Sequence, residues 1–177
     1  LNATKVVHQM VYESRWACWE CTAMKEALLI LFGFGLGTLP GWFDRKRKLR
    51  THWAALRAEL ELCREKASAL LNDSVQSPLY RLPQMAYEAS FPVLLAEGAV
   101  SEDEVLSVGR FYAQTQDINR GLDNATAMLQ ANDTSGLQRE YARNLLKANR
   151  LIGNGDSLHT SAMKVVNTKL ALSWWRY

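Results

Sequence analysis

The sequence has few of the residues that build catalytic and metal sites. It holds three cysteines and three histidines in 177 residues, and His8, His52 and His159 are far apart along the chain. Neither a Glu-x-x-His pair nor an H-E-x-x-H motif occurs. Those patterns build di-iron sites in helical bundles and zinc sites in proteases. The sequence therefore predicts no metal, no cofactor and no enzymatic activity.

Motifs for nucleophilic catalysis, nucleotide binding and nucleic-acid recognition are also missing. No G-x-S-x-G elbow presents a serine for attack. The glycine-rich run from Gly33 to Gly37 lacks the Lys-Ser/Thr of a P-loop and a flanking strand. Zinc-finger spacing, a reading helix and an aromatic RNA-binding signature are absent. Because the net charge is only +3, we expect no nucleic-acid partner.

Cysteine occurs only as Cys18, Cys21 and Cys63. An odd number without the framework of a secreted disulfide-rich domain indicates a reducing compartment. The spacing of Cys18 and Cys21 is that of a redox couple or of half a zinc site. No second pair of this kind exists, so chance spacing is the favoured interpretation.

The most informative feature is an uncharged, mainly apolar stretch, residues 27–43, here called the apolar segment. A length of about 17 residues is the lower end of the range that crosses a bilayer. A buried core helix is disfavoured because no polar face interrupts the stretch at helical spacing. A cleaved signal peptide is disfavoured because a basic run follows directly. The sequence predicts a single transmembrane anchor over residues 24–43.

Five basic residues follow the apolar segment and form what we call the basic cluster: Arg45, Lys46, Arg47, Lys48 and Arg50. Only Lys25 lies just before it, so the positive-inside rule places residues 44–177 in the cytoplasm. The basic cluster is expected to contact anionic lipid headgroups, each charge contributing about 1 kcal/mol. Trp42 is expected at the headgroup level.

Gly33 and Gly37 are four residues apart and share a helix face. Small residues at this spacing let two membrane helices approach closely. The pair predicts self-association of two anchors in a homodimer.

Residues 1–23 differ in character from the rest, with Trp16, Cys18, Trp19 and Cys21 close together and no clear helical stripe. The chain begins with Leu1, whereas Met24 with two charged residues directly precedes the apolar segment. We interpret residues 1–23 as a non-native or disordered leader and Met24 as the native start.

Residues 44–177 have the pattern of an antiparallel helical bundle, which makes the whole chain all-α with about four to five helices in the bundle. A heptad stripe predicts a helix to about Asn72 through Leu49, Trp53, Leu56, Leu60, Cys63, Ala67 and Leu70. The core face of an intramolecular bundle is favoured over a dimeric coiled coil because Cys63 and Ala67 make a thin seam. Arg57 with Glu61, four residues apart, and Glu61 with Arg64, three apart, are expected as pairs on the solvated flank.

Further helices are predicted over residues 85–96, from a capping box at Ser101 and Glu104 to about 131, and from about 134 to 152. The inner face of the last is expected at Leu137, Tyr141, Leu145, Ala148 and Ile152. Residues 157–177 predict a final helix that either completes the bundle or lies at a membrane interface, because Lys164 and Lys169 accompany Trp174 and Trp175.

The expected function is a membrane-anchored helical interaction or scaffold protein with an unidentified protein partner. One alternative is a soluble helical regulatory protein whose apolar helix docks into its own core or into a partner. Another is an envelope or phage accessory protein with its bundle outside the cytoplasm.

Overall fold

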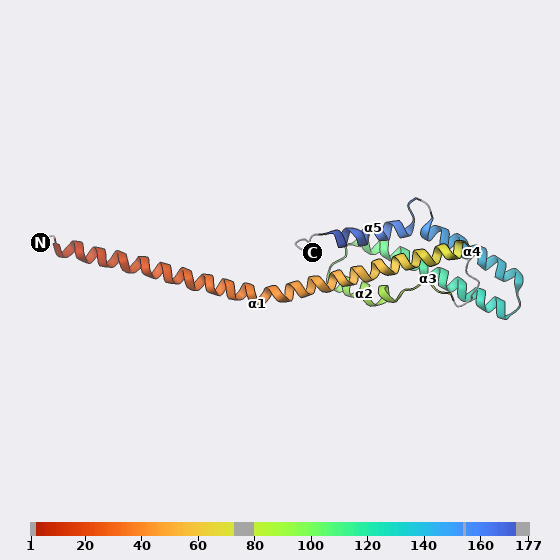
Figure 1. Ribbon diagram of the computed structural model, residues 1–177, viewed down its shortest axis with the longest axis horizontal. Coiled ribbons are helices and arrows are strands. Elements are labelled where there is room, and N and C mark those ends of the chain that lie inside the picture. Colours follow the sequence, from red (N-terminus) through yellow and green to blue (C-terminus); the bar gives the residue numbers. More distant parts are fainter. Residues whose placement is uncertain (1–2, 73–79, 154, 173–177) are drawn as a thin grey trace. The chain divides into compact units, whose positions relative to one another are not determined.

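The computed structural model describes residues 3–72, 80–153 and 155–172 (Figure 1). Side chains are described from Lys25 onward, except those of residues 31, 34, 36, 38 and 39. The described residues form no strand and five helices, α1 (Ala3–Leu71), α2 (Met85–Ala96), α3 (Glu102–Gln130), α4 (Thr134–Ile152) and α5 (Leu158–Ala171). The predicted all-α class is confirmed.

The chain divides into two compact units, Leu1–Arg45 and Lys46–Tyr177. Among the described residues, no helix has both the length and the apolar character needed to cross a membrane. The predicted transmembrane anchor over residues 24–43 is thus without support from the structure. Its side chains at 24, 31, 34, 36, 38 and 39 lie outside the described set, as do those of Cys18 and Cys21. The interpretation of residues 1–23 stays a prediction.

The second unit is a helical bundle, and the heptad stripe of α1 supplies one side of its core. All seven stripe residues from Leu49 to Leu70 are buried against other helices of the same chain. The favoured interpretation, an intramolecular core face, is therefore confirmed. The core is completed by apolar side chains of the other helices, among them Phe91, Leu94, Val108, Phe111, Ile118, Leu151 and Val166.

Helix α2 has the predicted bounds, and Gly98 follows it with a φ of 64°. This left-handed conformation suits glycine and lets the chain turn toward α3. Helix α3 begins at the predicted capping box, where the Ser101 amide donates to Glu104 Oε2 at 2.7 Å. The first turn of α3 contains three acidic residues, whose negative charges interact favourably with the positive end of the helix dipole.

Helices α4 and α5 follow each other along α3, α4 beside its C-terminal half and α5 beside its N-terminal half (Figure 1). Gly121 of α3 lies against Asn144 of α4, and a Cβ at Gly121 would come within 1.9 Å of Asn144 Oδ1. The two helices therefore approach closely at this glycine. Gly109 has open space around it, so it serves no such contact.

The predicted inner face of α4 is displaced by about one residue. Its buried residues are Gly136, Glu140, Asn144, Ala148 and Leu151. Of the predicted inner-face residues, Leu137, Tyr141, Leu145 and Ile152 are only half-buried. The helix is capped by Asp133, whose Oδ1 accepts from the Gly136 amide at 2.9 Å, and not by the neighbouring hydroxyl residues. In α3, Leu129 follows Ile118, Leu122 and Ala125 at heptad-like spacings, which predicts a buried side chain, but it is exposed.

Helix α5 completes the bundle, since His159, Ala162, Met163 and Val166 are buried. Its N-cap is Ser157, whose hydroxyl accepts from the Thr160 amide at 3.2 Å. Of the two interpretations of this segment, residues 158–171 fit the bundle. Trp174 and Trp175 lie outside the described residues.

Candidate functional site

The strongest candidate site in the first unit is the surface of the apolar segment. Leu28, Leu29, Ile30 and Phe32 are 51–72% exposed. Successive residues of an α-helix point about 100° apart, so these four side chains lie on several sides of α1. A helix with a single core-facing stripe would expose polar groups on its other sides. The contiguous apolar surface is therefore suited to contact with lipid or with another protein.

The basic cluster begins where the apolar segment ends. Four of its members, Arg45, Arg47, Lys48 and Arg50, are exposed, whereas Lys46 is only 9% exposed. Lys46 shares the buried face of α1 with Leu49, three residues on. Four of the five predicted basic contacts thus remain accessible, and Lys46 is the least available for a membrane surface.

Trp42, the remaining predicted membrane contact, is partly exposed. Its ring packs edge-on against Phe43, with centroids 5.2 Å apart and planes at 77°. Apart from its chain neighbours and the nearby backbone of α1, a Cβ added to Gly33 or to Gly37 would have no atom within 4 Å. The face that these glycines share is open in the single chain, and their role in self-association stays a prediction.

Inside the bundle, Glu59 is a buried carboxylate that no sequence motif indicates. Its Oε2 accepts from the Ala86 amide at 2.6 Å and its Oε1 from the Tyr87 amide at 3.0 Å. These amides belong to the first turn of α2, whose own N-cap, Gln84, makes no side-chain hydrogen bond. Glu59 therefore caps α2 from another helix, and the positive end of the α2 dipole favours its charge.

Cys63 lies one turn beyond Glu59 and is fully buried. Its Sγ donates to the Pro83 carbonyl at 3.3 Å. Burial, with the nearby Glu59 charge as a smaller contribution, raises the pKa of Cys63 to about 12. The thiolate is the reactive form of cysteine, so this thiol is inert at neutral pH and serves the core.

His159 is buried on α5 near the ring of Phe111, with centroids 6.1 Å apart. Its Nε2 makes no hydrogen bond within the described structure. No group of three or more His, Cys, Asp or Glu side chains among the described residues could hold a metal ion. Burial lowers the pKa of His159, with Glu61 and Arg64 making smaller, opposing contributions.

The lowered pKa of His159 predicts a loss of stability in mild acid. The unfolded chain gains a proton near pH 6.5, whereas the folded chain resists it until lower pH. Stability should therefore be fully present above pH 6.5 and fall as the pH drops below that value. Urea denaturation of full-length protein between pH 7.5 and pH 5 measures this fall. In a His159→Gln variant the fall should be smaller; an equal fall would contradict the assignment to His159.

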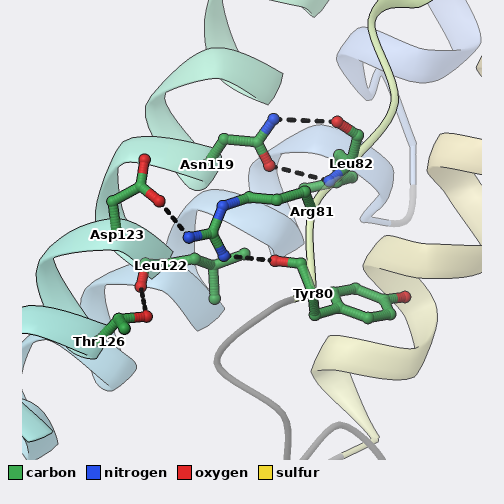
Figure 2. A network of polar contacts seen from close by, with 7 residues as sticks. All are labelled: Tyr80, Arg81, Leu82, Asn119, Leu122, Asp123 and Thr126. Carbon is green, nitrogen blue, oxygen red and sulfur yellow. Dashed lines mark hydrogen bonds and ion pairs between the residues drawn. The ribbon is translucent and has the colours of Figure 1, made fainter.

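A polar network fastens the segment before α2 to α3 (Figure 2). Asn119 accepts from the Leu82 amide at 2.8 Å and donates to the Leu82 carbonyl at 2.9 Å. Beside it, Arg81 pairs with Asp123 and donates to the Tyr80 carbonyl. The network holds Leu82 in the core and exposes no reactive group, so its role is structural.

The fold and these surfaces define an all-α protein whose bundle has a covered core and whose first unit carries an exposed apolar helix. No known family, curated protein or solved structure matches the chain.

Proposed function

We propose that this protein is a membrane-anchored helical interaction protein, with its apolar segment in a lipid bilayer and its bundle on the cytoplasmic side. The observation that carries the proposal is the exposure of Leu28, Leu29, Ile30 and Phe32 on several sides of α1. Moving a side chain of this size out of water contributes about 1.5–3 kcal/mol. A phase that surrounds the helix, as lipid does, would cover all of its sides at once.

The position of the basic cluster supports the orientation. Its four exposed members directly follow the apolar segment, where they would reach the headgroups of the cytoplasmic leaflet. Anionic headgroups contribute about 1 kcal/mol for each such charge. Together with the apolar segment they supply the two signals that stable attachment of a marginal anchor requires.

The bundle is the proposed interaction module. Exposed apolar side chains lie on several of its helices, namely Met85, Leu106, Leu129 and Leu146. A scaffold needs a stable shape with an accessible surface, and the buried core of the second unit gives it that shape. The proposed partner is a protein, including a second copy of the chain joined through Gly33 and Gly37.

A second candidate is a helical regulatory protein whose apolar segment docks onto a partner protein. It is favoured by the finding that no helix among the described residues is long and apolar enough to cross a membrane. An exposed apolar helix can bind in a groove of another protein as well as in lipid. The two candidates differ in what extracts the protein from a cell membrane fraction.

Substituting Leu29→Asp tests the anchor. A carboxylate in the bilayer interior costs about 2.5–3.5 kcal/mol, so we expect the membrane-bound fraction to fall about tenfold or more. The matched control is Leu146→Asp, because Leu29 and Leu146 are both leucines that are 72% exposed. Membrane fractions of cells expressing each full-length variant are compared by quantitative immunoblot.

Wild-type protein should stay in the membrane fraction after washing with high salt and with alkaline carbonate, and so should Leu146→Asp. Release by carbonate would reject insertion into the bilayer. Release by carbonate together with a stable complex of higher mass would support the partner-docking candidate. A reporter fused to the C-terminus checks orientation, and activity only outside the cytoplasm would contradict the proposal.

A further inference from the structure

A groove of about 620 Å³ lies between α1 and α5 within the second unit. One wall is formed by successive turns of α1 with Arg50, Ala54, Arg57 and Ala58, and the other by Asn167, Leu170 and Ala171 of α5. The alanines make a floor without bulky side chains. A volume of this size fits a small ligand or a lipid headgroup.

The groove is lined by two arginines and one carboxylate, that of Glu61, so its net charge is +1. Arg50 and Arg57 line it and make no ion pair among the described residues. Of the two pairs expected on this flank, Glu61 with Arg64 is present at 2.9 Å, whereas Arg57 with Glu61 is not formed among the described residues. The Glu61 carboxylate is thus already paired with Arg64, and the guanidinium groups of Arg50 and Arg57 are available to a ligand.

The spacing of the two arginines suits one anion between them. Seven residues of α-helix separate their Cα atoms by about 10 Å and place them on one face. Long flexible side chains can close that distance from both ends. Guanidinium groups bind phosphate with two parallel hydrogen bonds, and the amide of Asn167 supplies a further donor from α5.

We propose that this groove binds the phosphate of an anionic phospholipid headgroup through Arg50, Arg57 and Asn167. The choice of a lipid over free phosphate rests on the proposed membrane function, and it is favoured because Arg50 also belongs to the basic cluster. Leu170 offers an apolar contact for the glycerol part of a headgroup. The groove would then make the protein selective for anionic lipid.

The test is co-flotation of full-length protein with vesicles of phosphatidylcholine alone or with added phosphatidylglycerol. The measured quantity is the ratio of the two partition coefficients. Arg57→Gln removes a charge, and Ala54→Leu fills the floor without changing charge. Each should lower the ratio about fivefold, as expected for one lost headgroup contact. Arg110→Gln is the matched control, since Arg110 is an exposed arginine of α3 without an ion pair among the described residues and distant from the groove residues in sequence.

An equal fall with Arg57→Gln and Arg110→Gln would overturn the groove and leave only general charge attraction. An unchanged ratio with Ala54→Leu would also overturn it, because a built site must respond to filling. Millimolar inorganic phosphate should not lower the ratio more than chloride of equal ionic strength. Stronger competition by phosphate would reject the lipid as the ligand. Failure of the anchor is recognised separately, as absence of binding to neutral vesicles.

Discussion

Substituting Trp53→Ala should lower the free energy of unfolding by about 3–5 kcal/mol, the range for removing a large buried aromatic side chain. Trp53 is fully buried on the α1 stripe, and Lys169 Nζ lies 5.9 Å from the centroid of its ring. Its indole Nε1 makes no hydrogen bond within the described structure. Loss of that uncompensated polar group offsets part of the cost, which places the effect toward 3 kcal/mol, the lower end of about 3–5 kcal/mol.

Urea denaturation of full-length protein, followed by circular dichroism at fixed detergent concentration, measures the change. The matched control is Trp42→Ala, because Trp42 is an exposed tryptophan on the same helix. Its effect should stay within about 0.5 kcal/mol. A Trp53→Phe variant, which keeps most of the apolar volume, should fall between the two. Equal effects of Trp53→Ala and Trp42→Ala would contradict the position of Trp53 in the core.

The α1 stripe was predictable because its information is local. Leu49 to Leu70 repeat at heptad spacing, and each of those seven residues is buried. The bounds of α2 and the start of α3 were also predictable, since Pro and Gly positions and the Ser101 capping box signal helix ends directly. A strand or a loop in any of these segments would have required a different spacing of the same residues.

The face of α4 was not predictable in the same way. Glu140 and Asn144 lie in the middle of its buried face, although polar residues normally mark the solvent side of a helix. Asn144 is placed there by close packing against Gly121 of α3. That packing joins residues far apart in the sequence, so no periodicity within α4 carries it.

The groove between α1 and α5 was predictable only in part. Arg50 and Arg57 are visible in the sequence as basic residues on one helix, and the position of Arg50 after the apolar segment indicates a membrane surface. Their relation to Asn167 and Leu170 depends on α5 packing beside α1, which is a tertiary contact. The sequence therefore contained the charge of the site but not its second wall.

Substituting Glu59→Ala should destabilise the protein by about 1–3 kcal/mol, because two part-buried amides at the start of α2 would lose their acceptor. Glu59 lies 27 residues before Ala86 in the chain and still receives the Ala86 and Tyr87 amides. Losing a cap costs about 1 kcal/mol at an exposed helix start. The cost rises where two partly buried amides lose a charged acceptor at once. Urea denaturation measures the change.

Glu65→Ala is the matched control, since Glu65 is an exposed glutamate of α1 without an ion pair among the described residues, and its effect should stay within about 0.5 kcal/mol. Glu59→Gln keeps one acceptor oxygen but turns an amide NH₂ toward the other backbone amide, so it should be intermediate. If Glu59→Ala were no worse than Glu65→Ala, capping of α2 from α1 would be wrong. Both variants remove the same negative charge. A free energy of unfolding that rises from Glu59→Ala to Glu59→Gln to wild type would therefore assign the effect to the two acceptor oxygens.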